Sequence, residues 1–298
     1  MNNPETIRGG FCALIGRSNV GKSTLLNRLV GMRISSTADK PQTTRQNIRG
    51  IVTEHGAQIV FVDTPGIHLN DTHLLNAAMN KGAAAALTDV DAVVLVVEPG
   101  RWEREETRII EMVTAAGKPC LLCVNKIDRL RDRQSLLPIL ATMRERFDFA
   151  ALVPVSAVKG DNLDALKTEI IKLLPRCEAY IYPQDQLSDR DERFIVGELI
   201  REQLTRNLAA ELPYSVYVEV SDFEEREALT SIAATIWVAR ESHKAIVIGR
   251  SGHGLKKIGT RARIAIEKLL NRRCYLNLWV KVRPGWQDDA RIVGALTS

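Results

Sequence analysis

The stretch FCALIGRSNVGKSTLLNRLV, residues 11–30, decides the fold. Its beginning, FCALIG (11–16), has the composition of a buried strand, and residues 22–30 carry apolar side chains at helical spacing. Between them, GRSNVGKS (16–23) has the spacing of a phosphate-binding loop in the strand-to-helix context that such a loop requires. The stretch therefore predicts an α/β nucleotide-binding domain with phosphates at the helix N-terminus.

Each part of this loop has a predicted task. Gly16 and Gly21 permit the tight turn, and the backbone N–H groups cradle the phosphates. Lys22 would reach the outer phosphates and the Ser23 hydroxyl would ligate Mg²⁺. The residues of this loop that we expect to contact nucleotide are Gly16, Arg17, Ser18, Asn19, Val20, Gly21, Lys22, Ser23 and Thr24.

Outward from this stretch, short apolar strands alternate with amphipathic helical segments up to about residue 174. Strands are expected at 11–16, 48–53, 57–63, 92–98, 120–125 and 152–156, and helices at 22–30, 73–87, 103–116, 133–146 and 162–174. This alternation predicts a mainly parallel sheet covered on both faces, with ligands at the carboxyl ends of its strands.

The segment LPRCEAYIYPQDQLSD (174–189) interrupts the pattern with two prolines and little periodicity. We expect a nucleotide-binding domain at 1–175, a linker at 176–189 and an α+β domain at 190–298. Within the last, helices are expected near 190–208 and 254–270, and strands near 214–221, 229–239 and 274–282.

Composition indicates an ordinary globular protein: 45% of the 298 residues are hydrophobic and 26% are charged. There is no apolar run of the roughly 20 residues that a membrane helix needs, and the N-terminus lacks a signal-peptide profile, so we expect a cytoplasmic protein. Nothing in the sequence demands more than a monomer. Five cysteines favour reduced thiols, and Cys120 and Cys123 should point to opposite faces of a strand. His68 and His73 are expected to be loop residues.

The net charge of +5 conceals an asymmetry. Residues 240–283 contain 12 Lys and Arg but 2 Glu and no Asp, so the rest of the chain is net acidic. A concentration of this kind is either a solvated face or a polyanion-binding surface, and its position around one short glycine-containing loop favours the second interpretation.

The segment VDTPGI (62–67) ends the third predicted strand. Asp63 can hold Mg²⁺ through water, the Gly66 N–H can face the terminal phosphate, and the predicted nucleotide contacts are Asp63, Thr64, Pro65, Gly66 and Ile67. Many GTPases place a water-orienting glutamine where Ile67 stands. Either nucleotide is not hydrolysed or water is positioned in another way.

A further metal ligand is expected in QTTR (42–45), before the second strand. Thr44 is the chosen Mg²⁺ ligand beside Ser23 and Asp63, and Thr43 is the alternative.

The segment NKID (125–128), after the fifth strand, selects the base. Asp128 can accept hydrogen bonds from N1–H and the exocyclic amine of guanine, which adenine lacks in that arrangement. The other expected contacts are Asn125 at the base edge, Lys126 over the ring, the adjacent Ile127, and Ser156 and Ala157 of SAVKG. The combination predicts a GTP site.

A second site is expected around Gly249-Arg250-Ser251-Gly252. A G-x-x-G loop lets a nucleic-acid backbone approach in KH domains, although a plain helix-to-helix turn is the alternative. The predicted RNA contacts are Lys244, Ile248, Gly249, Arg250, Ser251, Gly252, Lys256, Lys257 and Arg261, and Arg263 adds charge. For Ile246 and Ile248, burial in the core is favoured over a groove position.

The motifs GRSNVGKS, QTTR, DTPG, NKID and SAVKG, followed by ELPYSVYVEV (211–220), VIGRSGHGLKKIGTRAR (247–263) and LNLWVKVRPGW (276–286), resemble the Era family of bacterial GTPases over about residues 8–290. The resemblance implies a Ras-like GTPase domain and a type II KH domain. It also implies binding to the 3′ end of 16S ribosomal RNA, help in 30S subunit maturation, and peripheral association with the inner membrane.

The resemblance also bears on Ile67. Related GTPases replace the catalytic glutamine with a hydrophobic residue, and several use K⁺ together with a loop asparagine, which Asn19 matches. It therefore implies slow, assisted hydrolysis with Lys22, Asn19, Thr44 and Gly66 as the catalytic set, and a GTP state that favours RNA.

Two rival functions stay open at this point. One is a nucleotide-gated scaffold at a membrane surface that barely turns over, in which the basic stripe meets anionic lipid. The other is a GTPase that assists tRNA modification, against which residues 180–290 speak.

Overall fold

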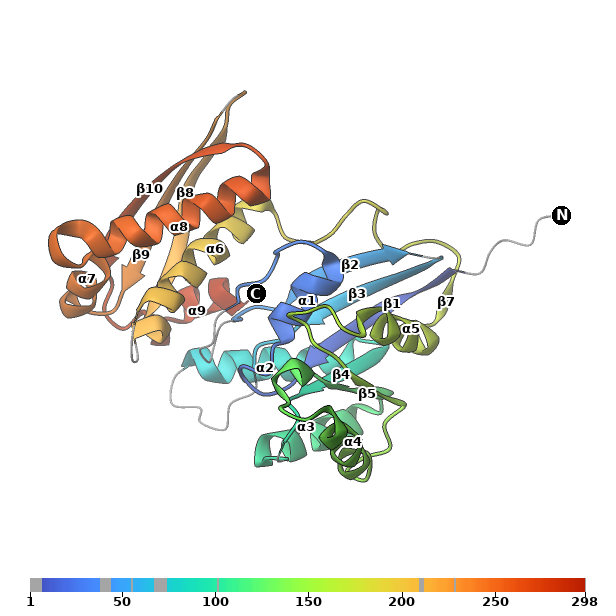
Figure 1. Ribbon diagram of the computed structural model, residues 1–298. Helices are drawn as coiled ribbons and strands as arrows, with labels where there is room; N and C mark the ends of the chain where they lie inside the picture. The colour runs from blue at the N-terminus through green and yellow to red at the C-terminus, as the bar shows by residue number, and fades with distance from the viewer. Residues whose placement is uncertain are drawn as a thin grey trace.

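The chain forms two sheets, each with helices of its own, in a computed structural model that describes residues 7–37, 44–54, 56–66, 74–100, 102–208, 212–227 and 229–297 (Figure 1). Ile67, His68, His73, Gln42 and Thr43 lie outside the described residues. No described helix is long and apolar enough to cross a membrane.

The first sheet has the order β2-β3-β1-β4-β5-β6, with β7 paired to the N-terminal end of β1. Its strands are β1 Ile7–Ile15, β2 Ile48–Glu54, β3 Ala57–Asp63, β4 Ala92–Val97, β5 Cys120–Val124, β6 Ala151–Pro154 and β7 Arg176–Cys177. All pairs are parallel except β2 with β3 and β7 with β1. The predicted mainly parallel sheet is confirmed.

Helices cover both faces of this sheet, as expected. They are α1 Lys22–Val30, α2 Leu74–Thr88, α3 Arg104–Ala116, α4 Leu136–Arg144 and α5 Leu163–Leu173. The helix expected to start at 133 starts at Leu136, because residues 133–135 form a 3₁₀ turn. Pro138 is tolerated in the first turn of α4, where no hydrogen bond from its nitrogen is needed. Cys120 and Cys123 are buried in separate cores on opposite faces, as predicted.

The second sheet has the order β10-β9-β8 and is covered on one face by two helices, α6 and α8 (Figure 1). Its elements are α6 Glu192–Asn207, β8 Val216–Glu225, β9 Leu229–Val238, α7 Glu241–Ile248, α8 His253–Leu270 and β10 Arg273–Val282. Strand β9 runs antiparallel to β8 and parallel to β10. This is the α+β arrangement that the resemblance implied.

A last helix, α9 Ala290–Thr297, was not expected from the sequence, and it packs on α2 of the first domain. Leu75 and Met79 of α2 join Ile292, Val293 and the fully buried Trp286 in a small core of their own. The two domains therefore share an apolar contact near the end of the chain.

Residues 176–189, the expected linker, are bound to the first sheet. Tyr182 exchanges hydrogen bonds with the Gln58 side chain, and the Ile51 amide donates to the Leu187 carbonyl at 2.9 Å. Ser188 forms a β-bridge with Gly50. The segment has little periodicity because it follows a sheet edge by backbone hydrogen bonding, which needs no alternation of side chains.

Candidate functional site

A pocket of about 550 Å³ lies at the carboxyl ends of the parallel strands. Predicted residues that line it are Ser18, Asn19, Gly21, Lys22, Ser23, Thr24, Thr44, Gly66, Asn125, Lys126, Asp128 and Ala157. The predicted residues that do not line it are Gly16, Arg17, Val20, Asp63, Thr64, Pro65, Ile127 and Ser156. The position of the pocket follows from the topology, because β1, β3 and β5 all end at this edge of the sheet.

The phosphate-binding loop wraps around the Lys22 ammonium. Its Nζ donates to the carbonyl oxygens of Gly16 and Arg17, each at 2.8 Å. Burial lowers the pKa of Lys22 to about 8, and the negative charge of Asp63 opposes this shift. Gly21 has φ 98°, and a Cβ there would collide with the Asn125 side-chain amide, so glycine is required.

The lowered pKa of Lys22 predicts a pH dependence of nucleotide affinity. Below pH 8 the free protein already holds the ammonium form that phosphates bind, so this group contributes no slope. Above pH 8 binding must first protonate Lys22, so GDP affinity should fall by up to about tenfold per pH unit.

Calorimetric titration between pH 6.5 and 9, below the pH at which guanine N1 is mostly ionised, measures this slope. Lys22→Met should bind weakly with no such slope. A wild-type affinity that stays constant from pH 8 to 9 would contradict the assignment.

Oxygen atoms of four side chains converge beside Lys22. Ser23 Oγ donates to Asp63 Oδ2 at 2.8 Å and lies 2.7 Å from Thr44 Oγ1, while Ser35 Oγ donates to the same carboxylate oxygen at 2.9 Å. Burial raises the pKa of Asp63, and Lys22 and the three hydroxyls oppose that rise.

This group fits a hard divalent cation. Asp63 Oδ1 is buried and has no hydrogen-bond partner among the described residues, although a carboxylate oxygen in such a place normally has one. The donors are oxygens throughout, as Mg²⁺ prefers. Ser23, Thr44 and Asp63 are therefore suited to hold it directly or through water.

Gly66 packs directly on the phosphate-binding loop. A Cβ at this position would lie 2.6 Å from Ser18 Oγ and 3.0 Å from the Ser18 backbone nitrogen and Cα. Thr64 fixes the preceding turn, because its hydroxyl donates to the Leu14 carbonyl at 2.9 Å. The backbone of residues 64–66 is thus held against the loop, where only a glycine fits.

Gly66→Ala is accordingly expected to lower the GTP hydrolysis rate about 10²-fold, the size of effect that a displacement near 1 Å produces at a reacting centre. GDP affinity should change less than threefold, since the base site and Lys22 are unaffected. Single-turnover rates and GDP titrations separate the two. Gly82→Ala on α2 is the matched control, because a Cβ there meets nothing within 4 Å.

The base side of the pocket is braced by Asn125. Its amide nitrogen donates to the Val20 carbonyl at 2.9 Å, and its Oδ1 accepts from the Ala157 N–H at 3.0 Å. Ser156 Oγ donates to Asp128 Oδ1 at 2.6 Å, which orients that carboxylate. Asn125 therefore joins the phosphate-binding loop to the SAVKG segment.

Lys126 and Asn19 meet at the rim of the pocket. Lys126 has φ 66°, and its Nζ donates to the Asn19 carbonyl at 2.5 Å and forms an ion pair with Glu98. Asn19 itself has φ 66° and is exposed to the pocket.

The second candidate site is the turn between α7 and α8. Gly249, Ser251 and Gly252 all have positive φ (71°, 50° and 80°), which explains the glycines. A Cβ on Gly249 would lie 2.9 Å from the Gly254 nitrogen. Two helices thus meet in a tight turn with little side-chain bulk.

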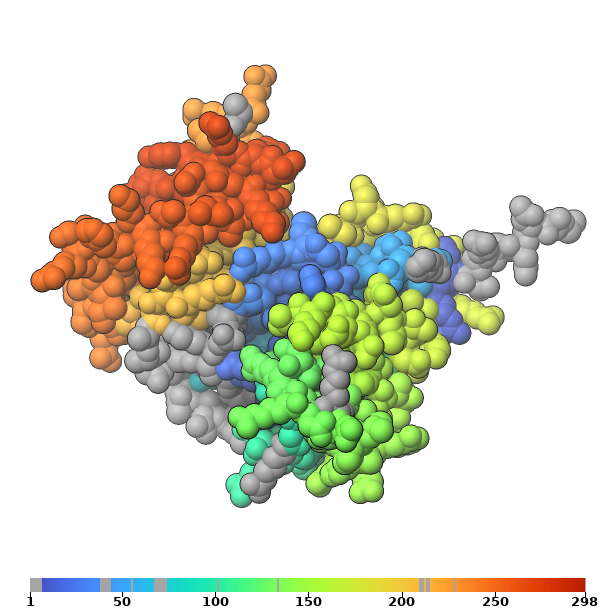
Figure 2. Space-filling view, in the orientation of Figure 1, coloured from blue at the N-terminus to red at the C-terminus, as the bar shows by residue number. Residues whose placement is uncertain are grey.

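A groove of about 390 Å³ adjoins this turn, between α8 and β10. Its floor is apolar, with Leu255, Leu276 and Leu278, and Lys256 and Arg263 lie along it. Figure 2 shows α8, in orange, forming an outer face of the second domain. Of the predicted RNA contacts, Gly252 and Lys256 line the groove. Those that do not line it are Lys244, Ile248, Gly249, Arg250, Ser251, Lys257 and Arg261.

The expectation that Ile246 is buried in the core was wrong, because the residue is 57% exposed. Ile248 is partly buried and packs against the core. The α7 helix has eight residues and turns its Ile246 side outward, which a short apolar run cannot reveal.

Several pocket residues were missed by motif reasoning: Ser36, Thr37, Arg129, Val158 and Arg206. Val158 lies inside SAVKG, so its position in that motif could have found it, whereas Ser36 and Thr37 belong to no quoted motif. Arg206 is on α6 of the second domain, and nothing in its local sequence indicates a contact with the pocket.

Two family models match the chain: that of the 50S ribosome-binding GTPase over residues 11–126, and that of the KH domain over residues 211–287. GTPase Era of Xanthomonas axonopodis pv. citri (strain 306) is 49% identical over 282 residues, covering 95% of this chain and 94% of that protein. GTPase Era of Azotobacter vinelandii is 45% identical over 296 residues, covering 99% and 98%.

Solved structures agree over almost the whole chain. A single-residue variant of Aquifex aeolicus Era bound to GDP·AlF4⁻ is 34% identical, with a TM-score of 0.92, and 97% of this chain and 99% of that one are covered. Era in complex with MgGDPNP and nucleotides 1506–1542 of 16S ribosomal RNA gives the same identity and TM-score, with 97% and 98% covered. The chain therefore belongs to the GTPase Era family and is a GTPase with a C-terminal KH domain.

Proposed function

We propose that this GTPase binds the 3′ end of 16S ribosomal RNA and assists maturation of the 30S subunit, with the GTP state favouring RNA. The observation that carries the proposal is the groove beside the Gly249–Gly252 turn, apolar in its floor and basic along its length, on the same chain as the guanine-selective pocket. An apolar groove next to a G-x-x-G turn suits unstacked bases with their backbone held close.

We assign nucleotide binding to residues 1–175 and RNA binding to residues 190–298. Lys22 holds the outer phosphates, Asp128 accepts from guanine, and the Gly66 N–H faces the terminal phosphate. Ser23, Thr44 and Asp63 hold Mg²⁺, which neutralises charge on the phosphate oxygens when bound. Hydrolysis would release the loops that carry Thr44 and Gly66, and RNA with them.

Finer parts of the proposal are K⁺ as an activator, peripheral association with the inner membrane, and a monomeric state. Support for K⁺ is the exposed position of Asn19 at the pocket. If Asn19→Ala leaves the ratio of hydrolysis rates in K⁺ and Na⁺ unchanged, the K⁺ part is wrong.

Crosslinking of GTP-loaded and GDP-loaded protein to RNA in lysate, followed by sequencing, tests the main proposal. Recovery of the 3′ end of 16S ribosomal RNA, stronger with GTP, is expected.

A Lys256→Ala/Lys257→Ala variant should bind RNA more weakly than the wild type. The slope of log affinity against log salt concentration should become shallower by about 0.7 for each phosphate contact that is lost. Arg226→Ala, which removes a cation paired to Glu224 on the β8–β9 hairpin, is the control. Scattered or nucleotide-independent crosslinks would instead favour a membrane-surface role for α8.

A further inference from the structure

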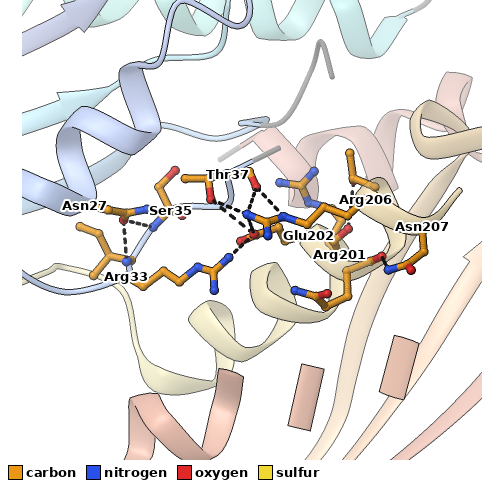
Figure 3. Close-up of polar contacts among 11 residues, drawn as sticks. Asn27, Arg33, Ser35, Thr37, Arg201, Glu202, Arg206 and Asn207 are labelled. Carbon is orange, nitrogen blue, oxygen red and sulfur yellow. Dashed lines mark hydrogen bonds and ion pairs between the residues drawn. The ribbon is translucent and has the colours of Figure 1, made fainter. Parts of the chain in front are cut away.

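The two domains meet at a buried carboxylate. Glu202 of α6 is fully buried, and its Oε1 forms ion pairs with Arg33, which follows α1, and with Arg206 at 2.6 Å (Figure 3). Thr37 Oγ1 also donates to Oε1, at 3.3 Å. A carboxylate that is buried must be compensated, so these partners are held in a defined geometry.

Arg206 extends from this carboxylate to the nucleotide pocket. Its Nε and Nη2 donate to the Thr37 carbonyl at 3.2 and 3.0 Å, and Nη2 also donates to Thr37 Oγ1 at 3.3 Å (Figure 3). Arg206, Thr37 and Ser36 all line the pocket. The guanidinium of the KH domain thus belongs to the wall of the site where GTP is hydrolysed.

The second domain also holds the other end of the same segment. Arg45, one residue after Thr44, donates to the Val216 carbonyl at 2.8 Å and stacks over Trp286 at 5.6 Å. Thr44, next to Arg45 in the chain, is therefore adjacent to a residue that the KH domain fixes. Its hydroxyl is one of the predicted Mg²⁺ ligands, so its placement depends on how the domains are docked.

A hydrogen bond also links the neighbour of Arg206 to a predicted RNA contact on α8. The residue after Arg206 is Asn207, whose Oδ1 accepts from Arg261 Nη1 of α8 at 3.1 Å. Arg261 is exposed and is among the predicted RNA contacts. Helix α6 thus carries the pocket contact and the contact to α8 on adjacent residues.

We propose that Arg206 is a positioning residue for GTP hydrolysis, supplied to the nucleotide pocket by the KH domain. It fixes Thr37, two residues after Ser35, whose hydroxyl donates to Asp63 Oδ2 at the Mg²⁺ site. Through Asn207, RNA bound at Arg261 changes this hold and so changes the hydrolysis rate. The last step rests on the RNA binding proposed above, whereas the role of Arg206 does not.

The first experiment uses the full chain without RNA. In Arg206→Ala the hydrolysis rate at saturating GTP should fall about tenfold, because the hydrogen bonds from Arg206 to Thr37 are lost. The Mg²⁺ concentration that gives half the maximal rate should rise by a similar factor. GDP affinity should stay within threefold, since the base site and Lys22 are unaffected. Arg206→Lys keeps the charge near Glu202 and should recover part of the rate.

Arg226→Ala is the matched control, since it removes an arginine whose ion pair, with Glu224, lies on the β8–β9 hairpin. Side-chain packing alone would affect thermal stability without moving the Mg²⁺ requirement. If Arg206→Ala and Arg206→Lys both match Arg226→Ala within twofold in rate and in Mg²⁺ requirement, the proposal is overturned.

The second experiment adds a short RNA with the sequence of the 3′ end of 16S ribosomal RNA. Asn207→Ala should leave the RNA-free rate unchanged and RNA affinity within threefold, while the change in rate that RNA causes in the wild type is lost. An RNA effect of wild-type size in Asn207→Ala would overturn the relay. A wild type that binds no RNA would refute the proposed function and the relay, while the Arg206 result would stand on the first experiment.

Discussion

Asp128→Asn is expected to weaken GDP and GTP binding by about 10²–10³-fold, equivalent to roughly 3–4 kcal/mol for two charge-assisted hydrogen bonds. In the proposed site the carboxylate accepts from two donors of guanine, and Ser156 donates to it. An amide in its place would set its own NH2 against one of these donors. Binding of xanthine nucleotides should improve, because xanthine has a carbonyl where guanine has its amine.

Competition titrations with GDP and XDP measure this change in base preference. Asp132→Asn is the matched control, because Asp132 is an exposed acid near the base-binding segment whose side chain only caps the Gln134 amide. A GDP affinity within threefold of wild type in Asp128→Asn would show that the base is read elsewhere.

Lys22→Ala should lower kcat/KM for GTP by about 10²–10³-fold, the usual effect of removing one donor from a site where charge develops. The Lys22 ammonium is at the centre of its loop, 2.8 Å from two carbonyl oxygens, so no other described side chain can replace it. The variant should stay folded, because the change removes a buried cation whose lowered pKa reports the cost of burying it.

Steady-state kinetics and thermal unfolding together test that expectation. Lys172→Ala, which removes an exposed lysine paired to Glu169, is the control. A kcat/KM within fivefold of wild type, with the fold intact, would contradict the role given to Lys22.

Most of the nucleotide pocket could be predicted from the sequence because its parts are local. GRSNVGKS, DTPG and NKID each follow a strand, and parallel strands must end at one edge of a sheet. Their side chains therefore converge whatever the intervening helices do. Ser35 reaches Asp63 by its place just after α1, which no motif specified.

The contacts that sequence reasoning missed join residues far apart in the chain. Arg206 meets Thr37 and Trp286 meets Arg45 only because the two domains dock, and docking leaves no periodicity in either segment. The hydrogen bonds that join residues 176–189 to the first sheet likewise leave no periodicity in that segment. The prediction that Ile246 is buried failed for a different reason. In an eight-residue helix, three consecutive apolar residues do not indicate which one faces the core.

The docked segment after β7 also has a consequence for biosynthesis. Strand β2 ends the described sheet, and its outer edge is covered by Leu187 and Ser188, with Asp189 accepting from the Arg49 amide at 3.2 Å. An uncovered edge strand offers unpaired backbone groups to any other extended chain. On the ribosome the nucleotide-binding domain is translated before this cover, so its edge is open until residue 189 has left the exit tunnel. A fragment ending at residue 175 would keep that edge open permanently and should aggregate by strand pairing, whereas one ending at residue 191 should stay dispersed.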